Sequence, residues 1–256
     1  MSDGKRNQKV EHILKGINLN KTFGTKDRNI QALKDVDFYL DEGELLGIAG
    51  ESGSGKSTLL NVMSGLIRPD SGELFYREQE YTGKGPLQTG RFLQMIFQDA
   101  KSSFDPRFTM ERSLLESRRK KTDRDALCGI LKEVGLDEKL LKRKVSELSG
   151  GQCQRMSIAR ALYSEANILL CDEITSAVDV SSQAQVVEIL KKLNVERKLS
   201  AIFVSHDIAL LSTLCTRIMV MKDGQVVEQG LTTDVIGTPG HEYTKLLIES
   251  ARKQSL

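Results

Sequence analysis

The sequence predicts an α/β fold, in which helices cover a sheet. Short runs rich in apolar and β-branched residues alternate along the chain with longer segments that have a helical apolar period. A glycine-rich loop stands between one such run and one such segment. The composition, with 39% hydrophobic and 28% charged residues, is that of an ordinary globular protein. The 256 residues fit one large domain, or one domain into which a lobe is inserted.

The expected strands are short runs of apolar and β-branched residues. They cover residues 12–23, 36–40, 45–49, 74–76, 92–97, 168–171, 201–204, 218–221 and 225–228. Asp223 and Gly224, between the last two runs, predict a hairpin turn.

Apolar periodicity and capping residues predict three main helices, at residues 56–65, 150–163 and 181–197. Strand runs vanish between residues 99 and 147, where charged helical segments replace them, at 124–134 and 138–145. We therefore expect a helical lobe of about residues 99–157, inserted into a domain of residues 10–235. A short tail of residues 236–256 follows and contains a helix at 241–252.

Charge and hydropathy limit the classes of function. Lys and Arg number 37 against 35 Asp and Glu, and a net charge of +2 gives no strongly basic field that would favour nucleic acid as a partner. The longest run without a charged residue, 57–67, is far shorter than the ~20 residues of a membrane-spanning helix. The polar N-terminus does not resemble a secretory signal, so we expect a cytosolic chain. The four cysteines are far apart, as reduced thiols would be.

The strongest motif is a complete P-loop of the form G-x-x-x-x-G-K-[ST], between an expected strand and an expected helix. It consists of Gly50, Glu51, Ser52, Gly53, Ser54, Gly55, Lys56, Ser57 and Thr58. We expect backbone N–H groups of this loop to surround nucleotide phosphates, Lys56 to reach the β- and γ-phosphates, and Ser57 to hold Mg²⁺. The alternative, a chance turn rich in glycine and serine, does not explain the strand, the helix and the Lys-Ser-Thr sequence together.

Two carboxylates, Asp172 and Glu173, end the expected strand at 168–171. If that strand lies beside the P-loop strand, Asp172 reaches the Mg²⁺ shell and Glu173 orients a water molecule for in-line attack on the γ-phosphate. The alternative is a helix N-cap followed by an acidic residue in the first helical turn. The presence of a P-loop favours the catalytic interpretation.

A second glycine-rich helix start follows Leu148 and provides a second potential anion site on the same chain. It consists of Ser149, Gly150, Gly151 and Gln152. Its position between a P-loop and an Asp-Glu strand resembles the signature of the ATP-binding-cassette (ABC) ATPases, although a simple glycine-rich cap is the alternative. The resemblance covers residues 17–230 and implies a P-loop NTPase (RecA-like) core, an antiparallel β subdomain and an inserted helical signature lobe. In that family, the signature of one subunit closes over the ATP held by another subunit.

The same resemblance assigns roles to four further residues. Phe23 matches the aromatic residue that stacks on adenine, and Gln98 matches the glutamine that reaches Mg²⁺ and links the site to membrane subunits. Asp179 lies in a segment similar to the loop that passes between two subunits. His206 matches the histidine that contacts the γ-phosphate and Glu173.

Two segments are similar to those of importer ATPases for peptides and nickel. Residues 94–107 resemble the stretch that follows the glutamine loop, and residues 241–247 resemble a C-terminal His-Pro-Tyr-Thr motif. Ala100, Phe104 and Glu242 depart from that pattern. The departures weaken the assignment to this branch and leave the ATPase assignment unchanged.

We therefore expect an ATP- and Mg²⁺-dependent ATPase that powers the import of nickel, a metal chelate or a peptide. Its expected partners are a second, identical or homologous ATPase subunit, two permease subunits and, through them, an extracytoplasmic solute-binding protein. Its expected place is the cytoplasmic face of the cell membrane. The alternatives are an ABC exporter ATPase, a non-transport ABC ATPase and a nucleotide-binding module without turnover.

Overall fold

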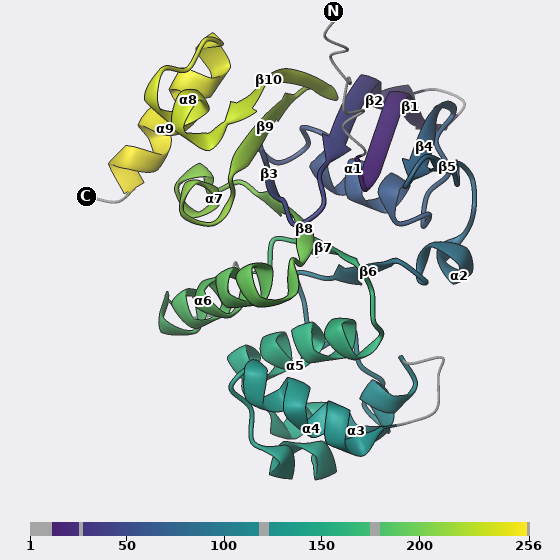
Figure 1. The fold of residues 1–256 in the computed structure, drawn as a ribbon. Helices are drawn as coiled ribbons and strands as arrows, with labels where there is room; N and C mark the ends of the chain where they lie inside the picture. The colour runs from purple at the N-terminus through teal and green to yellow at the C-terminus, as the bar shows by residue number, and fades with distance from the viewer. Residues whose placement is uncertain (1–11, 26–27, 118–122, 175–179, 255–256) are drawn as a thin grey trace, which may run out of the picture.

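The strands form two sheets with different pairing (Figure 1). The structure, a computed structural model, describes residues 12–25, 28–117, 123–174 and 180–254. An antiparallel sheet has the order β2 (Arg28–Leu40), β1 (Leu14–Thr25), β4 (Ser71–Tyr76), β5 (Gln79–Glu80). The second sheet has the order β10 (Gln225–Leu231), β9 (Arg217–Lys222), β3 (Leu45–Ala49), β8 (Ser200–Ser205), β7 (Ile168–Asp172), β6 (Leu93–Ile96). Only its edge strand β10 is antiparallel to its neighbour.

Helices pack on this second sheet and also form a lobe below it in Figure 1. The helices near the sheets are α1 (Lys56–Met63), α2 (Pro86–Thr89), α6 (Val180–Arg197), α7 (Ile208–Leu214), α8 (Thr232–Gly237) and α9 (Glu242–Gln254). The lobe consists of α3 (Met110–Leu115), α4 (Arg124–Glu133), the 3₁₀ segments η1 (Glu138–Lys142) and η2 (Val145–Glu147), and α5 (Gly150–Tyr163). The predicted fold class, an α/β P-loop core with an antiparallel subdomain and a helical lobe, is confirmed.

Two hydrophobic clusters meet at the second sheet because its central strands are buried on both faces. Along β3, Leu46 and Ile48 belong to the cluster shared with α1 and the antiparallel sheet. Leu45 and Ala49 point to the other face and join the cluster that continues into the lobe and to α9. The alternation follows the two-residue period of a strand. It fixes the strand register and therefore the height at which each strand ends.

Parallel strands present their carboxyl ends at one edge, and the predicted chemical groups follow four of these ends. The P-loop follows β3, Asp172 ends β7, His206 follows β8 and Gln98 comes shortly after β6. The expectation that the Asp-Glu strand lies directly beside the P-loop strand is wrong. Strand β8 pairs with both β3 and β7 and lies between them, which brings His206 between the two motifs.

Other differences between expectation and structure have local causes. Strand β2 begins at Arg28 because its polar first half pairs with β1, where antiparallel pairing does not require a buried face. The segment expected to be helical at 138–145 forms two short 3₁₀ turns. Asp223 and Gly224 form the predicted hairpin turn, with φ angles of 49° and 83°. A turn of the same kind, through Arg77 and Glu78, joins β4 to β5.

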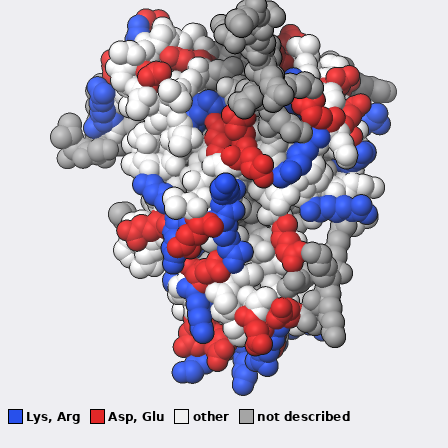
Figure 2. All heavy atoms as spheres, in the orientation of Figure 1, with Lys and Arg blue, Asp and Glu red and all other residues white. Residues whose placement is uncertain are grey.

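The described surface shows mixed charge. On the face in Figure 2, Lys and Arg side chains are interspersed with Asp and Glu side chains, and the described atoms do not form a surface of one sign. In the described part of the chain, no helix has both the length and the apolar composition needed to cross a bilayer.

Candidate nucleotide-binding site

The P-loop, residues 50–55, surrounds the buried ammonium group of Lys56. Lys56 is 5% exposed, and its Nζ donates to the carbonyl oxygens of Gly50 and Glu51 at 2.7 Å and 2.8 Å. Burial lowers the pKa of Lys56 by disfavouring the charged form, while the carboxylates of Glu173, Asp172 and Glu51 oppose that change. The loop therefore holds a poorly hydrated positive group where an anion can approach it.

A cavity of about 680 Å³ opens over the P-loop. Its lining residues are Asn29, Ile30, Gln31, Ala32, Lys34, Ser52, Gly53, Gly55, Lys56, Ser57, Thr58, Glu173 and Asp223. Gly55, which precedes α1, has no side chain to cap that helix. The first-turn N–H groups of α1 and the helix dipole therefore favour an anion at this end.

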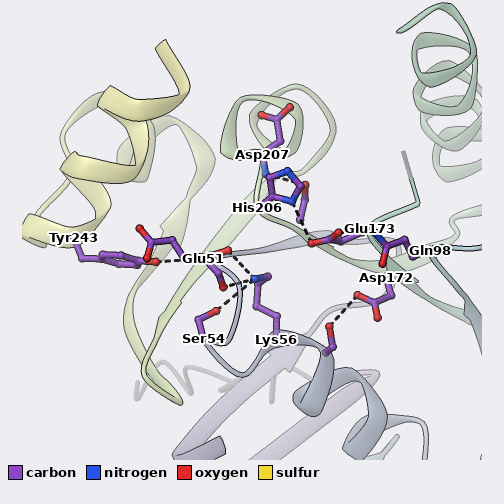
Figure 3. A network of polar contacts seen from close by, with 12 residues as sticks. Glu51, Ser54, Lys56, Gln98, Asp172, Glu173, His206, Asp207 and Tyr243 are labelled. Carbon is purple, nitrogen blue, oxygen red and sulfur yellow. Dashed lines mark hydrogen bonds and ion pairs between the residues drawn. The ribbon is translucent and has the colours of Figure 1, made fainter. Parts of the chain in front are cut away.

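Ser57, which lines the cavity, and Asp172 form a pair of oxygen-bearing side chains. Ser57 Oγ lies 3.3 Å from Asp172 Oδ1 (Figure 3). Burial raises the pKa of Asp172, and the nearby Glu173 carboxylate acts in the same direction, whereas Ser57 and Lys56 oppose it. Hydroxyl and carboxylate oxygens are ligands that Mg²⁺ prefers, and a divalent cation would relieve the cost of this buried charge. The two residues therefore fit the expected metal.

Glu173 is held by contacts to both of its carboxylate oxygens. Oε1 lies 3.2 Å from His206 Nδ1, and Oε2 accepts from Gln98 Nε2 at 3.0 Å (Figure 3). Its backbone N–H donates to the carbonyl oxygen of Val204 at 3.0 Å. Its φ of 44° lies in the left-handed region, which is unfavourable for a residue with a Cβ. The structure therefore holds this carboxylate in one orientation at a conformational cost. Groups that take part in a reaction are often held in this way.

The glycine-rich start of α5 is capped and closely packed. Ser149 Oγ accepts from the N–H of Gln152 at 3.2 Å, and Gln152 Oε1 accepts from the N–H of Ser149 at 3.0 Å. A Cβ on Gly151 would lie 2.7 Å from Ser182 Oγ of α6, so α5 and α6 approach closely at this glycine. None of the residues from Ser149 to Gln152 is among the described residues that line the cavity over the P-loop.

The structure brings several predicted residues together and places others apart. Lys56, Asp172, Glu173, His206 and Gln98 lie close together (Figure 3), with Ser57 beside Asp172, whereas the signature lies on the lobe. Phe23 is 41% exposed and pairs across β1 and β2 with Ile30, which lines the cavity. Asp179 lies outside the described residues.

Two features of the site escaped the sequence prediction. The lining from Asn29 to Lys34 comes from the polar half of β2, and only its pairing with the strand that carries Phe23 could have indicated it. The second is Tyr243 of α9, whose hydroxyl accepts from the N–H of Glu51 at 2.9 Å. The motif at residues 241–247 contains Tyr243, but a contact across 192 positions cannot be inferred from a local motif.

A loop suited to phosphate, an oxygen pair suited to Mg²⁺ and a positioned carboxylate are the features of a P-loop ATPase. Comparison with known proteins agrees with this class. Residues 33–176 match the family described as ABC transporter. The chain therefore belongs to the ABC transporter family of ATP-binding proteins.

Curated relatives match most of the chain. The oligopeptide transport ATP-binding protein OppF of Haemophilus influenzae is 39% identical over 238 residues, which cover 89% of this chain and 72% of that protein. The probable D,D-dipeptide transport ATP-binding protein DdpF of Escherichia coli is 37% identical over 233 residues, with coverage of 89% and 72%.

Solved structures show the same fold. The dimeric, post-hydrolysis structure of the ATP-binding cassette MJ0796 bound to ADP and Pi has a TM-score of 0.76 and 32% identity. It covers 86% of this chain and 98% of its own. The CbiO1 subunit of the cbiONQ transporter complex of Clostridium perfringens has a TM-score of 0.78 and 26% identity, covering 96% of this chain and 100% of its own.

Proposed function

We propose that this chain is the ATP-hydrolysing subunit of a multi-chain importer that takes up oligopeptides through separate permease subunits. The observation that carries the proposal is the 39% identity to OppF over most of the chain, together with an intact group of Lys56, Asp172, Glu173 and His206. The peptide-transport names of the curated relatives favour a peptide over nickel or a metal chelate as the solute.

In the proposed mechanism the P-loop binds the phosphates of ATP. The backbone N–H groups at the start of α1 and the Lys56 ammonium stabilise the negative charge that spreads over the γ-phosphoryl oxygens. Ser57 and Asp172 would hold Mg²⁺, which supplies positive charge next to the phosphates when it is bound. Phe23, exposed beside Ile30 at the edge of the cavity, provides an aromatic face for adenine.

Glu173 orients and polarises the attacking water in this mechanism. Gln98 donates to one carboxylate oxygen and His206 contacts the other, and these two contacts oppose rotation of the carboxylate. His206 follows β8, the strand next to the P-loop strand, which supports a role for His206 in responding to the γ-phosphate. Because Gln98 also belongs to the segment between the core and the lobe, it connects the state of the site to the surface of the molecule.

The signature is proposed to act on a second ATPase subunit. The capped start of α5 presents N–H groups and helix dipole, both suited to phosphate, away from the cavity of its own chain. A head-to-tail dimer would place Ser149, Gly150, Gly151 and Gln152 over the ATP of the partner, with Asp179 between the subunits. The structure of the cassette MJ0796 bound to ADP and Pi is dimeric, which supports a dimer of ATPase subunits.

The permease is proposed to dock on an apolar hollow of about 190 Å³ at the junction of core and lobe. The lining residues are Ser64, Leu66, Pro86, Thr89, Gly90, Leu93, Gln94, Met95, Phe97 and Arg160. Leu66 and Phe97 are 49% and 40% exposed, and exposed apolar side chains that gather in one place mark contact surfaces. Two permease subunits, reached by a solute-binding protein on the other side, would hold the ATPase at the cytoplasmic face of the membrane.

The test is uptake by cells that lack this chain. A deletion strain that requires amino acids should stop growing on oligopeptides as their source, and the full chain supplied on a plasmid should restore growth, whereas Lys56→Met should not. Nickel uptake measured with the same strains should stay unchanged. Normal peptide uptake in the deletion strain would contradict the proposed solute, and a defect confined to nickel would replace it.

A further inference from the structure

Helix α9, near the C-terminal end, contacts the phosphate-binding loop through one side chain (Figure 3). Tyr243 is 6% exposed, and its hydroxyl accepts a hydrogen bond from the N–H of Glu51 at 2.9 Å. Its ring packs in the core cluster that also contains Leu247 and Ile248, and Lys222 Nζ lies 5.0 Å from the ring centroid. The ring therefore has packing contacts on several sides, and its hydroxyl points at the phosphate-binding loop.

The start of α9 fixes the direction of this side chain. The carboxylate of Glu228, on β10, accepts from the N–H groups of Gly240 and His241 at 2.7 Å and 3.0 Å. His241 Nδ1 in turn accepts from the N–H of Tyr243 at 3.1 Å. The turn before α9 is thus bonded to the second sheet, whose strand β3 leads into the P-loop.

The contact bears on Lys56 through a single peptide group. The N–H of Glu51 and the carbonyl of Gly50 belong to the same planar peptide unit and point in opposite directions. The N–H is held by Tyr243, and the carbonyl accepts from Lys56 Nζ at 2.7 Å. Gly50 has a φ of 154°, and a Cβ there would lie 2.4 Å from the carbonyl oxygen of Met221. Position 50 therefore cannot carry a side chain that would hold the peptide group in place.

We propose that Tyr243 is a positioning residue for the P-loop, which sets the plane of the Gly50–Glu51 peptide and thereby the place of the Lys56 ammonium group. The proposal rests on the proposed function, because it takes ATP as the ligand of Lys56. Hydrogen bonds at the two ends of one peptide group strengthen each other, so loss of the hydroxyl weakens the anchor of Lys56 as well. Helix α9 is on this view a part of the nucleotide site.

The variant Tyr243→Phe removes only the hydroxyl and keeps the ring. We expect the Kd for ATP, and the KM in turnover, to rise roughly tenfold, as when a part-buried N–H loses its partner. The kcat at saturating ATP should change by less than about threefold, because bound phosphates then hold Lys56 themselves.

The matched control is Tyr163→Phe, which removes a buried hydroxyl in the lobe that accepts from the N–H of Asp123 at 3.0 Å and donates to the carbonyl oxygen of the same residue at 3.2 Å. It should leave Kd and KM for ATP unchanged. An unchanged KM in Tyr243→Phe, or an equal rise in both variants, would overturn the proposal. If wild type itself neither binds nor hydrolyses ATP, the proposed function fails instead.

A double-mutant cycle tests the route through Lys56. The free energy of unfolding of the full chain without nucleotide is measured for wild type, Tyr243→Phe, Lys56→Met and the double variant. We expect non-additive effects, because both side chains act on one peptide group. Additive effects would overturn the proposed route. If Tyr243→Phe does not fold, Glu228→Gln, which weakens the turn that directs Tyr243, takes its place in the KM and cycle measurements with the same two outcomes.

Discussion

At the scale of single residues, the site combines three charged groups in unfavourable surroundings. The ammonium of Lys56 and the carboxylate of Asp172 are partly stripped of water, and Glu173 adopts a left-handed backbone conformation. Such costs are tolerated where the arrangement serves binding or chemistry. Each of them therefore predicts a separable consequence of substitution.

Glu173→Gln keeps the shape of the side chain but removes the charge that polarises water. Turnover should fall by ~10²-fold or more, the range for a positioned general base, while ATP binding stays within about twofold of wild type. ATPase rate of the purified complex and Kd for ATP check the two parts. A variant that hydrolyses ATP at the wild-type rate would remove Glu173 from the mechanism.

Asp172→Asn should stabilise the chain at neutral pH in the absence of nucleotide and Mg²⁺. The pKa of Asp172 in the folded chain lies above its ordinary value of 3.8, so the folded state binds more protons between the two values. Stability therefore falls as pH rises through that window, and the ionised carboxylate is a net cost above it. The gain measured for Asp172→Asn should be present at pH 7 and disappear below about pH 4.

Asp70→Asn provides a control of opposite sign. The pKa of Asp70 is lowered by hydrogen bonds from Lys21 Nζ at 2.7 Å and from the N–H of Thr22 at 2.6 Å. This carboxylate stabilises the fold above its unfolded pKa and loses its effect as pH falls. The melting temperature at pH 7 should therefore rise for Asp172→Asn and fall for Asp70→Asn. Changes of the same sign would contradict the opposite directions of the two pKa shifts.

At the scale of elements, the sequence patterns predicted the positions of the chemical groups better than they predicted which strands lie side by side. The P-loop, the Asp-Glu strand and the signature helix each have a local motif, and α5 begins and ends at the predicted residues. The pairing of β8 between β3 and β7 has no such motif, because strand order depends on long-range packing of apolar faces. The β4–β5 turn escaped prediction because Arg77 and Glu78 adopt positive φ without glycine or asparagine.

Ser149→Arg tests the role of the signature helix. A bulky cation at the start of α5 should block closure over a partner's γ-phosphate and reduce turnover by ~10²-fold or more, as for loss of a positioned transition-state group. ATP binding to the isolated chain should not weaken, because Ser149 does not line its own cavity. An equal loss of ATP affinity would place Ser149 in the site of its own chain.

The substitution also removes a helix cap, which costs about 1 kcal/mol of stability. Asp123→Arg is the matched control, since Asp123 Oδ1 caps α4 of the same lobe by accepting from the N–H of Ala126 at 3.0 Å. It loses a cap and gains the same cation at a site away from the signature. Its turnover should stay near wild type while its stability falls by a similar amount.

At the scale of the whole molecule, the nucleotide site and the apolar hollow are joined by rigid contacts. Phe97, at the hollow, precedes Gln98, which contacts Glu173. Arg160 of α5 also lines the hollow and donates to the carbonyl oxygen of Ser103 at 2.7 Å, which ties the signature helix to the segment after Gln98. No sequence motif shows this connection, because it depends on how the lobe sits against the core.

Leu66→Glu should separate transport from hydrolysis. Leu66 is half-exposed at the rim of the hollow, so a carboxylate there costs little stability but opposes an apolar partner surface. The docked permease receives the conformational state of the nucleotide site, whereas hydrolysis requires only that the nucleotide site close. Weaker docking therefore reduces transport more than it reduces ATP hydrolysis. We expect oligopeptide uptake by cells to fall at least about tenfold, while the basal ATPase rate of the purified chain changes less than about twofold. Val195→Glu, at another exposed apolar position on α6, where the side chain is 79% exposed against 49% for Leu66, is the control and should leave uptake intact. Equal uptake by both variants would show that the permease contacts another surface, and a parallel loss of uptake and basal hydrolysis in Leu66→Glu would show that the hollow supports the nucleotide site itself.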